Sequence, residues 1–169
     1  MTENGALSGR VALITGSGAG MGRTHAILMA ERGADIVVQD VESATANDTA
    51  AEVKKRGRRA LAFAHDIADI AASRAMVQKA EAELGHIDIL VNNAGIGGGH
   101  KHFEEIDEAQ FDRMVGVHVT GHFFLTQAIV PGMKARRMGK IINISSRWAM
   151  TGAEVSSHYI ACKSALLGL

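Results

Sequence analysis

The chain has 169 residues, 47% of them hydrophobic, which is enough apolar material for the core of one domain. Eighteen basic and eighteen acidic residues give a formal net charge of zero, which argues against a nucleic-acid partner. No run approaches the ~20 apolar residues of a membrane span, and no signal peptide is recognisable. The one cysteine, Cys162, cannot form an internal disulfide, which fits the reducing cytoplasm. From these features together we expect a cytoplasmic protein that binds no membrane.

The first predicted element is a buried strand over 10–15, an apolar run that ends in β-branched residues. A glycine-rich turn over 16–22 follows it directly, and a helix is predicted over 23–32. This order places a pyrophosphate against backbone N–H groups at a helix N-terminus. The glycine spacing is Gly-x3-Gly-x-Gly, because Met21 occupies the last position of the Gly-x-Gly-x-x-Gly template. A flexible turn without a ligand is the alternative.

A second strand is predicted over 35–40 and ends in an acidic residue, Asp40, 24 positions after Gly16. A carboxylate at this spacing accepts hydrogen bonds from the adenosine ribose and repels a 2′-phosphate. The next positions, 41–43, contain no lysine or arginine that would attract such a phosphate. The sequence therefore favours NAD over NADP. The alternative is that Asp40 only caps the following helix.

The rest of the chain continues the alternation of strands and helices. The predicted helices are 43–56, 69–84 and 107–138, and the predicted strands are 60–64, 87–92 and 140–144. Alternation predicts an α/β domain in which helices cover both faces of a parallel sheet and ligands bind at the carboxyl ends of the strands. We expect one domain over residues 1–169. A capping box is predicted over 107–110, and a helix kink is predicted at Pro131.

Three residues near the end of the chain form the pattern Ser-x12-Tyr-x3-Lys: Ser146, Tyr159 and Lys163. On a helix the tyrosine and the lysine share one face, so the ammonium can stabilise the phenolate. The serine would bind the substrate oxygen, which gains or loses a proton as its carbon gains or loses hydride. Taken alone, a tyrosine and a lysine four positions apart also fit an ordinary surface helix.

Together these motifs resemble the short-chain dehydrogenase/reductase family, over a match that runs from about Gly9 to Leu169. The resemblance implies a doubly wound parallel sheet (Rossmann fold) and NAD-dependent interconversion of a secondary alcohol and a ketone. It also implies a small-molecule substrate and assembly as a homodimer or homotetramer. The catalytic residues it implies are Ser146, Tyr159, Lys163 and His118. The implied cofactor-binding residues are Gly16, Ser17, Gly20, Met21, Gly22, Asp40, Asp66, Ile67, Asn93, Ala94, Gly95, Tyr159 and Lys163.

His118 is a departure from the family pattern, since relatives usually carry an asparagine there that holds a water linking the lysine to solvent. An imidazole could bind that water or shuttle protons, because its ordinary pKa lies near ~6.5. A similar histidine occurs in the hydroxyacyl-CoA dehydrogenase units of multifunctional β-oxidation enzymes. The alternative is a histidine that only packs within its helix.

Two other functions stay open at this point: a non-catalytic dinucleotide-binding protein, and an NADP-dependent 3-oxoacyl reductase. No metal is expected, because the pairs His100/His102 and His118/His122 lack a third ligand at suitable spacing. The loop histidines are expected near the substrate mouth or in solvent, and Trp148 and Met150 are candidates for an apolar substrate wall.

The resemblance also implies further strands and helices after Leu169. We therefore expect this chain to be a shortened version of a longer protein, with the fold incomplete at its C-terminus. The strand at 140–144 would then be an unpaired sheet edge, and the isolated polypeptide would be poorly stable, prone to self-association and weakly active.

Overall fold

Five strands form a single parallel sheet in the order β3-β2-β1-β4-β5 in the computed structural model, which describes residues 5–169. The strands are β1 (Val11–Thr15), β2 (Asp35–Asp40), β3 (Ala60–Ala64), β4 (Ile89–Asn92) and β5 (Lys140–Asn143). The strand order runs outward from β1 in both directions, so the topology reverses between β1 and β4. This confirms the doubly wound Rossmann fold and places the expected ligand crevice beside β1.

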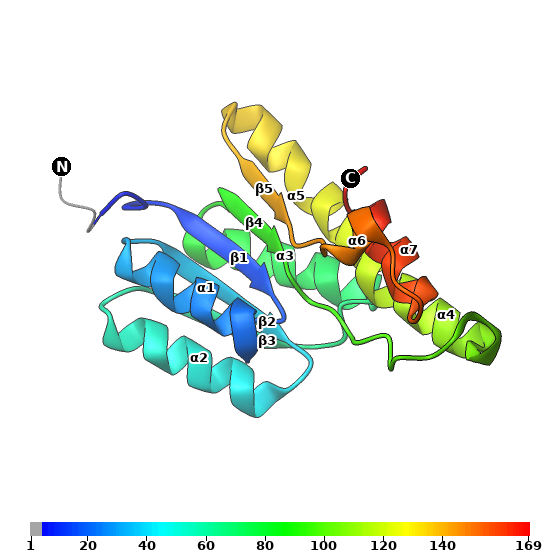
Figure 1. The fold of residues 1–169 in the computed structure, drawn as a ribbon. Helices are drawn as coiled ribbons and strands as arrows, with labels where there is room; N and C mark the ends of the chain where they lie inside the picture. Colours follow the sequence, from blue (N-terminus) through cyan, green and yellow to red (C-terminus); the bar gives the residue numbers. More distant parts are fainter. Residues whose placement is uncertain (1–4) are drawn as a thin grey trace.

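Helices cover both faces of the sheet, with α1 and α2 on one face and α3 and α5 on the other (Figure 1). The helices are α1 (Gly20–Glu31), α2 (Ser43–Lys55), α3 (Ile70–Leu84), α4 (Glu108–Val115), α5 (His122–Arg136), α6 (Trp148–Thr151) and α7 (Ser157–Ala165). A 3-10 turn, Phe103–Glu105, precedes α4, and a π-helical turn, Gly116–Gly121, joins α4 to α5. Within residues 5–169, none of the helices has the length and apolar character that crossing a bilayer requires.

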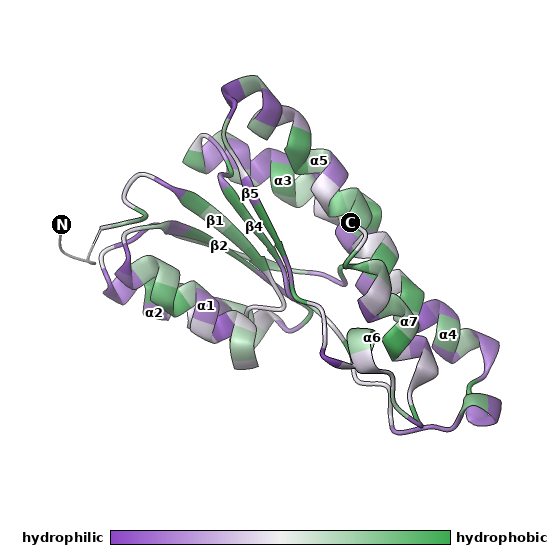
Figure 2. Cartoon of the chain, turned by 45° about the horizontal axis from the view of Figure 1, so that its top comes forward, coloured by the Kyte–Doolittle hydropathy of each residue, from purple (hydrophilic) through white to green (hydrophobic). Residues whose placement is uncertain are grey.

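The core consists of two apolar layers, one on each face of the sheet. Leu13 and Val37 belong to the layer that packs under α3 and α5, whereas Ala12 and Ile14 belong to the layer under α1 and α2. Figure 2 shows the hydrophobic strands between helices whose outer sides are more polar. Burial on both faces explains why the central strands are continuous apolar runs without alternation.

Several predicted elements are confirmed to the residue, including the strands over 35–40 and 60–64. The capping box at Asp107 is also confirmed, since its side chain accepts from the N–H of Gln110 while the Gln110 side chain accepts from the N–H of Asp107. Helix α1 begins at Gly20, three residues before its predicted start, so the last glycines of the turn already belong to the helix.

The predicted helix over 107–138 corresponds to a continuous helical run over 108–136, but this run is not α-helical throughout. The segment is divided by the π-helical turn Gly116–Gly121, and the helix after it continues through Pro131. The turn lies in close contact with the loop after β3: a Cβ atom on Gly121 would lie 2.6 Å from the carbonyl oxygen of Ile67. The apolar pattern does not encode this contact, because the helical period persists across the turn.

β5 lies at the edge of the sheet, and in the described part of the chain it pairs only with β4. Ile141 and Ile142 keep 39% and 41% of their surface exposed, in contrast to the buried residues of β1 and β4. The predicted strand 140–144 is therefore an edge strand in this structure, as the sequence indicated.

Candidate active site

A cavity of about 400 Å³ lies at the carboxyl ends of β1, β2 and β4, where the strand order reverses. Ten of the predicted cofactor-binding residues line it: Gly16, Gly20, Met21, Gly22, Asp40, Asp66, Ile67, Asn93, Ala94 and Gly95. The sequence motifs that lie far apart along the chain therefore meet in one place. We refer to this space as the glycine-turn cavity.

The glycine turn has a conformation that suits a phosphate. Gly16 and Gly20 have positive φ angles of 62° and 53°, and a Cβ atom on Gly22 would lie only 2.2 Å from the carbonyl oxygen of Gly16. No side chain caps the N-terminus of α1, and its first turn contains no acidic residue. The free N–H groups at this helix end can therefore receive an anion, so these residues fit the pyrophosphate of a dinucleotide.

Ser17 differs from the other turn residues because its side chain is buried away from the cavity. Its hydroxyl donates to the carbonyl oxygen of Ile14 at 2.7 Å and accepts from the N–H of Gln39 at 3.2 Å. The side chain thus joins β1 to β2, and it is not among the residues that line the glycine-turn cavity. The backbone N–H of Ser17 also donates to the carbonyl oxygen of Gln39, at 2.9 Å, so contact of Ser17 with a cofactor stays a prediction.

Asp40 lies at the end of β2 and lines the same cavity. Its Oδ2 accepts from the N–H of Gly18 at 2.7 Å, and its Oδ1 accepts from the N–H of Glu42 at 3.2 Å. The N-cap of α2 is Glu42, so the alternative that Asp40 caps this helix is wrong. The carboxylate is therefore fixed beside the glycine turn.

Asp66 is held by Arg113 from α4, a cavity residue that the sequence did not reveal. The Arg113 Nη1 lies 2.5 Å from Asp66 Oδ2, and the N–H of Ala68 donates to Asp66 Oδ1 at 3.0 Å. Burial alone would raise the pKa of Asp66, but these two partners outweigh burial and lower it. No sequence pattern links positions 66 and 113, because the contact depends on how α4 docks.

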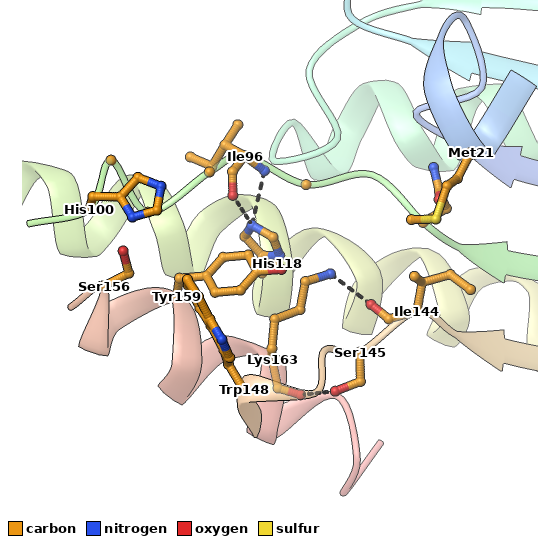
Figure 3. Close-up of a pocket in the computed structure, with 15 residues that line it drawn as sticks. Met21, Ile96, His100, His118, Ile144, Ser145, Trp148, Ser156, Tyr159 and Lys163 are labelled. Carbon is orange, nitrogen blue, oxygen red and sulfur yellow. Dashed lines mark hydrogen bonds between the residues drawn. The ribbon is translucent and has the colours of Figure 1, made fainter. Parts of the chain in front are cut away.

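A second cavity, of about 460 Å³, adjoins the first and shares Met21, Asn93, Gly95 and Ile96 with it. Figure 3 shows His118, Trp148, Tyr159 and Lys163 together in this second cavity. The two cavities therefore have part of their walls in common. We refer to the second space as the tyrosine cavity.

Lys163 lies beside Tyr159 on α7, as their spacing predicted. The Lys163 Nζ is 5.9 Å from the centre of the Tyr159 ring and donates to the carbonyl oxygen of Ile144 at 2.7 Å. Burial lowers the pKa of Lys163, whose exposed fraction is only 4%. The lysine is thus a partly desolvated cation with a fixed position next to the phenol.

Ser146 lies at the start of α6, and its Oγ accepts from the N–H of Trp148 at 3.2 Å. The neighbouring Ser145, not Ser146, is among the residues that line the tyrosine cavity. The Ser145 hydroxyl donates to the carbonyl oxygen of Lys163 at 2.6 Å, which ties the end of β5 to α7. The contact of Ser146 with a substrate therefore stays a prediction.

His118 lies on the π-helical turn and is fully buried, with its ring edge-on to Tyr159 at a centroid distance of 5.5 Å. Its Nε2 is 3.0 Å from both the N and the O of Ile96, and its Nδ1 has no partner among residues 5–169. Burial, assisted by the charge of Lys163, lowers the pKa of His118 to about 4. The pKa of His118 is therefore well below the ordinary value of an imidazole, and the ring is neutral at pH 7.

An aromatic wall closes the tyrosine cavity on one side. The Trp148 ring is edge-on to Tyr159 and to His100, with a centroid distance of 6.3 Å in each pair. Trp148 and His100 both line the cavity, as expected from the sequence, but Met150 and His102 do not, and Met150 is 76% exposed. Of the two residues that were candidates for an apolar substrate wall, only Trp148 therefore lines the cavity.

Comparison with known proteins decides the family. The profile described as short chain dehydrogenase matches residues 10–169, which is nearly the whole chain. This chain belongs to the short-chain dehydrogenase family. Membership confirms the resemblance inferred from the glycine turn and the Ser-x12-Tyr-x3-Lys pattern.

Curated short-chain dehydrogenases match over 96% of this chain. The (2S)-[(R)-hydroxy(phenyl)methyl]succinyl-CoA dehydrogenase subunit BbsD of Thauera aromatica is 37% identical over 163 residues, and the chain covers 65% of its length. The 2-dehydro-3-deoxy-D-gluconate 5-dehydrogenase of Dickeya dadantii is 39% identical over 164 residues, and 64% of its length is covered. The chain therefore spans about two thirds of the length of these relatives.

Solved short-chain dehydrogenases share the fold closely. NAD+-bound xylitol dehydrogenase superposes with a TM-score of 0.93 at 28% identity, over 96% of this chain and 63% of that one. A 7α-hydroxysteroid dehydrogenase, in complex with NADH and 7-oxo glycochenodeoxycholic acid, superposes with a TM-score of 0.90 at 36% identity. That match covers 98% of this chain and 64% of the steroid dehydrogenase.

The two buried histidines of this short-chain dehydrogenase predict a loss of stability in mild acid. Burial lowers the pKa of both His118 and His122 to about 4 from an ordinary value of 6.5. As the pH falls below 6.5, these two histidines become protonated in the unfolded chain. In the native state they stay neutral until the pH approaches 4. The free energy of unfolding should therefore fall between pH 6.5 and 4, by up to roughly 3 kcal/mol for each imidazole.

Urea denaturation at pH 7.5, 6 and 5 measures this loss. The double variant His118→Asn/His122→Asn should show a shallower dependence over this range, because asparagine does not titrate there. A free energy of unfolding that stays constant from pH 7.5 to 5 in the unaltered protein would contradict the account.

Proposed function

We propose that this chain forms the catalytic centre of an NAD-dependent oxidoreductase that interconverts a secondary alcohol and a ketone. The observation that carries the proposal is the position of Tyr159, beside the buried Lys163, in a cavity that shares wall residues with the glycine-turn cavity. Proton transfer and nucleotide binding are thereby adjacent, which is the arrangement that hydride transfer to or from a carbon–oxygen bond needs.

We propose one role for each catalytic side chain. When bound, the nicotinamide would supply or accept the hydride. Tyr159 gives its phenolic proton to the ketone oxygen during reduction and takes one from the alcohol during oxidation. The ammonium of Lys163 stabilises the phenolate, and Ser146 donates its hydroxyl proton to the substrate oxygen. That proton is available because the Ser146 Oγ acts as an acceptor toward Trp148.

His118 supports the return of the proton to solvent. Its Nε2 is equally close to the N–H and to the carbonyl oxygen of Ile96, so it can accept from one or donate to the other. If Nε2 accepts from the N–H of Ile96, the ring proton is on the unpartnered Nδ1. If Nε2 donates to the carbonyl oxygen of Ile96, Nδ1 carries a lone pair. The Nδ1 of the neutral ring can therefore act either as a donor or as an acceptor, which is the property that a proton relay requires.

Variants of His118 test this role. His118→Leu removes both ring nitrogens and should lower kcat by about tenfold to a hundredfold, with little change in NADH affinity. His118→Asn introduces the residue that relatives usually carry, and it should preserve or raise kcat. Steady-state kinetics and fluorescence titration with NADH give the two readouts. Equal turnover of the leucine variant and the unaltered protein would instead favour a histidine that only packs.

We propose a hydroxy or oxo compound as the substrate, without a narrower class. The Thauera relative is named for a hydroxylated succinyl-CoA and the Dickeya relative for a sugar acid, and both names describe a dehydrogenase. A hydroxyacyl or 3-oxoacyl compound is therefore one candidate among several. Family membership also supports assembly as a homodimer or homotetramer in the cytoplasm, which sedimentation of the purified protein and cell fractionation would test.

Matched pairs of secondary alcohols and ketones test the proposal directly. The protein is expected to reduce NAD+ with at least one alcohol and to oxidise NADH with the corresponding ketone, as followed by NADH absorbance. If NADH binds but no pair in a broad panel is turned over, the non-catalytic dinucleotide-binding alternative holds. If turnover occurs with NADPH alone, the NADP-dependent reductase alternative holds.

A further inference from the structure

His122, the first residue of α5, lies between the two halves of the site and contacts neither cavity. Its side chain is fully buried. The Nδ1 lies 3.0 Å from the carbonyl oxygen of His118, and the Nε2 lies 3.3 Å from the Oγ1 of Thr15 at the end of β1. One imidazole therefore bridges the π-helical turn and the strand that leads into the glycine turn.

These two contacts fix the tautomer of His122. A carbonyl oxygen can only accept, so the proton of the neutral ring must be on Nδ1. The Nε2 is then a lone pair and accepts from the Thr15 hydroxyl. Burial, assisted by the charges of His118 and Lys163, lowers the pKa of His122 to about 4, although the bond to the His118 carbonyl acts in the opposite direction. The ring is therefore neutral at pH 7.

Thr15 extends this connection to the loop after β4. Its Oγ1 accepts from the backbone N–H groups of Asn93 and Ala94, both at 2.9 Å. The hydroxyl proton must then go to an acceptor, and His122 Nε2 at 3.3 Å and the carbonyl oxygen of Val91 at 3.4 Å are the two within reach. Asn93 and Ala94 line the glycine-turn cavity, so the chain of hydrogen bonds begins at the expected cofactor site.

The other end of the chain is the carbonyl of His118, inside the π-helical turn. The backbone N–H of His122 bonds to Val119, so at this position it is the side chain that supplies the bond to the His118 carbonyl. The His118 ring is confined in turn by Gly95, where a Cβ atom would lie 2.6 Å from His118 Cε1. A shift of the turn would therefore move the His118 ring relative to Tyr159.

We propose that His122 is a positioning residue, which holds the His118 carbonyl in register with the loop at Asn93 and Ala94. This deepens the proposed function, since it rests on His118 as the proton relay. The Nδ1–H of His122 donates to the His118 carbonyl, on the side of the proton relay. The Nε2 accepts from the Thr15 hydroxyl, on the side of the expected cofactor site. The two ends can therefore be altered separately.

The tautomer can be measured without any assay of activity. In protein labelled with 15N at histidine, two-bond 1H–15N correlation spectra at pH 7 distinguish an Nδ1–H ring from an Nε2–H ring. His122 is assigned by comparison with His122→Asn. We expect the Nδ1–H form, and an Nε2–H form or a mixture would overturn the proposal. Because no substrate is needed, this result is independent of whether the proposed reaction is correct.

Two amide substitutions separate the ends of the bridge. The Asn side chain in His122→Asn can keep a donor near the Nδ1 position, whereas the Gln side chain in His122→Gln can keep an acceptor near the Nε2 position. We expect His122→Gln to lower kcat by about tenfold while NADH affinity stays within about twofold. We expect His122→Asn to keep most of kcat and to weaken NADH binding by about tenfold.

The control is His86→Gln, which replaces a partly exposed histidine that bonds to Asp88 before β4. It should leave kcat and NADH affinity unchanged. Thermal melts of all three variants identify any that unfold. If His122→Asn and His122→Gln lose the same activity and the same NADH affinity, His122 only fills the core and the proposal is overturned. If a variant does not fold, the test rests on the tautomer of His122 in the unaltered protein. The Nδ1–H form supports the proposal, and an Nε2–H form or a mixture overturns it.

Discussion

Tyr159→Phe is expected to lower kcat by about 10²–10⁴-fold, because it removes the proton donor and leaves the ring. The edge-on contacts with His118 and Trp148 are made by the ring, so the shape of the tyrosine cavity should persist. NADH affinity should change by no more than about twofold, since the glycine turn and Asp40 line a different part of the site. Stopped-flow measurement of NADH oxidation gives the rate, and fluorescence titration gives the affinity.

The outcome has a simple interpretation because Tyr159 is the only tyrosine in the chain. No other phenol can take over its role. A variant that retains most of its turnover would show that another group transfers the proton. A variant that loses NADH binding together with turnover would show instead that the substitution disturbs the fold.

NADH is expected to bind at least about a hundredfold more tightly than NADPH, because a 2′-phosphate would face the carboxylate of Asp40. Like charges brought together in a partly desolvated contact cost several kcal/mol. Bonds from Gly18 and Glu42 hold the carboxylate in place, so it cannot easily turn away from the phosphate. Asp40→Asn keeps an acceptor but removes the charge, and it should reduce the preference to about tenfold or less.

Asp66→Asn is the matched control for Asp40. Asp66 lines the same cavity, but its carboxylate is already paired with Arg113. Its substitution should weaken NADH and NADPH to a similar degree and leave their ratio unchanged. Fluorescence titration with NADH and with NADPH gives the dissociation constants for the unaltered protein and for both variants. NADPH binding that equals or exceeds NADH binding in the unaltered protein would refute the role of Asp40.

Much of the fold was predictable because the central strands are short apolar runs that alternate along the chain with helical segments. The strand over 35–40 is buried on both faces, and its composition reflects this directly. The glycine turn was predictable for a different reason. Positive φ at Gly16 and the close approach at Gly22 require glycine, so the conformation is encoded in the residue types.

The features that were not predictable depend on tertiary contacts. The π-helical turn contains Gly121, which lies close to the carbonyl of Ile67, and this contact has no local signal in the sequence. The neutral state of His118 follows from complete burial near Lys163, which a sequence does not display. The ion pair between Arg113 and Asp66 likewise depends on the docking of α4 over the loop after β3.

The central claim is that hydride passes between a nicotinamide and a substrate carbon while Tyr159 transfers the proton. Transfer of deuterium tests this claim most directly. The protein is incubated with NADH carrying deuterium on the reactive face of C4 and with a ketone that it reduces, and the alcohol is analysed by mass spectrometry. We predict one deuterium on the carbinol carbon with the unaltered protein and almost no alcohol with Tyr159→Phe. Oxidation of the cofactor without deuterium in the alcohol, or equal yields from both proteins, would contradict the account.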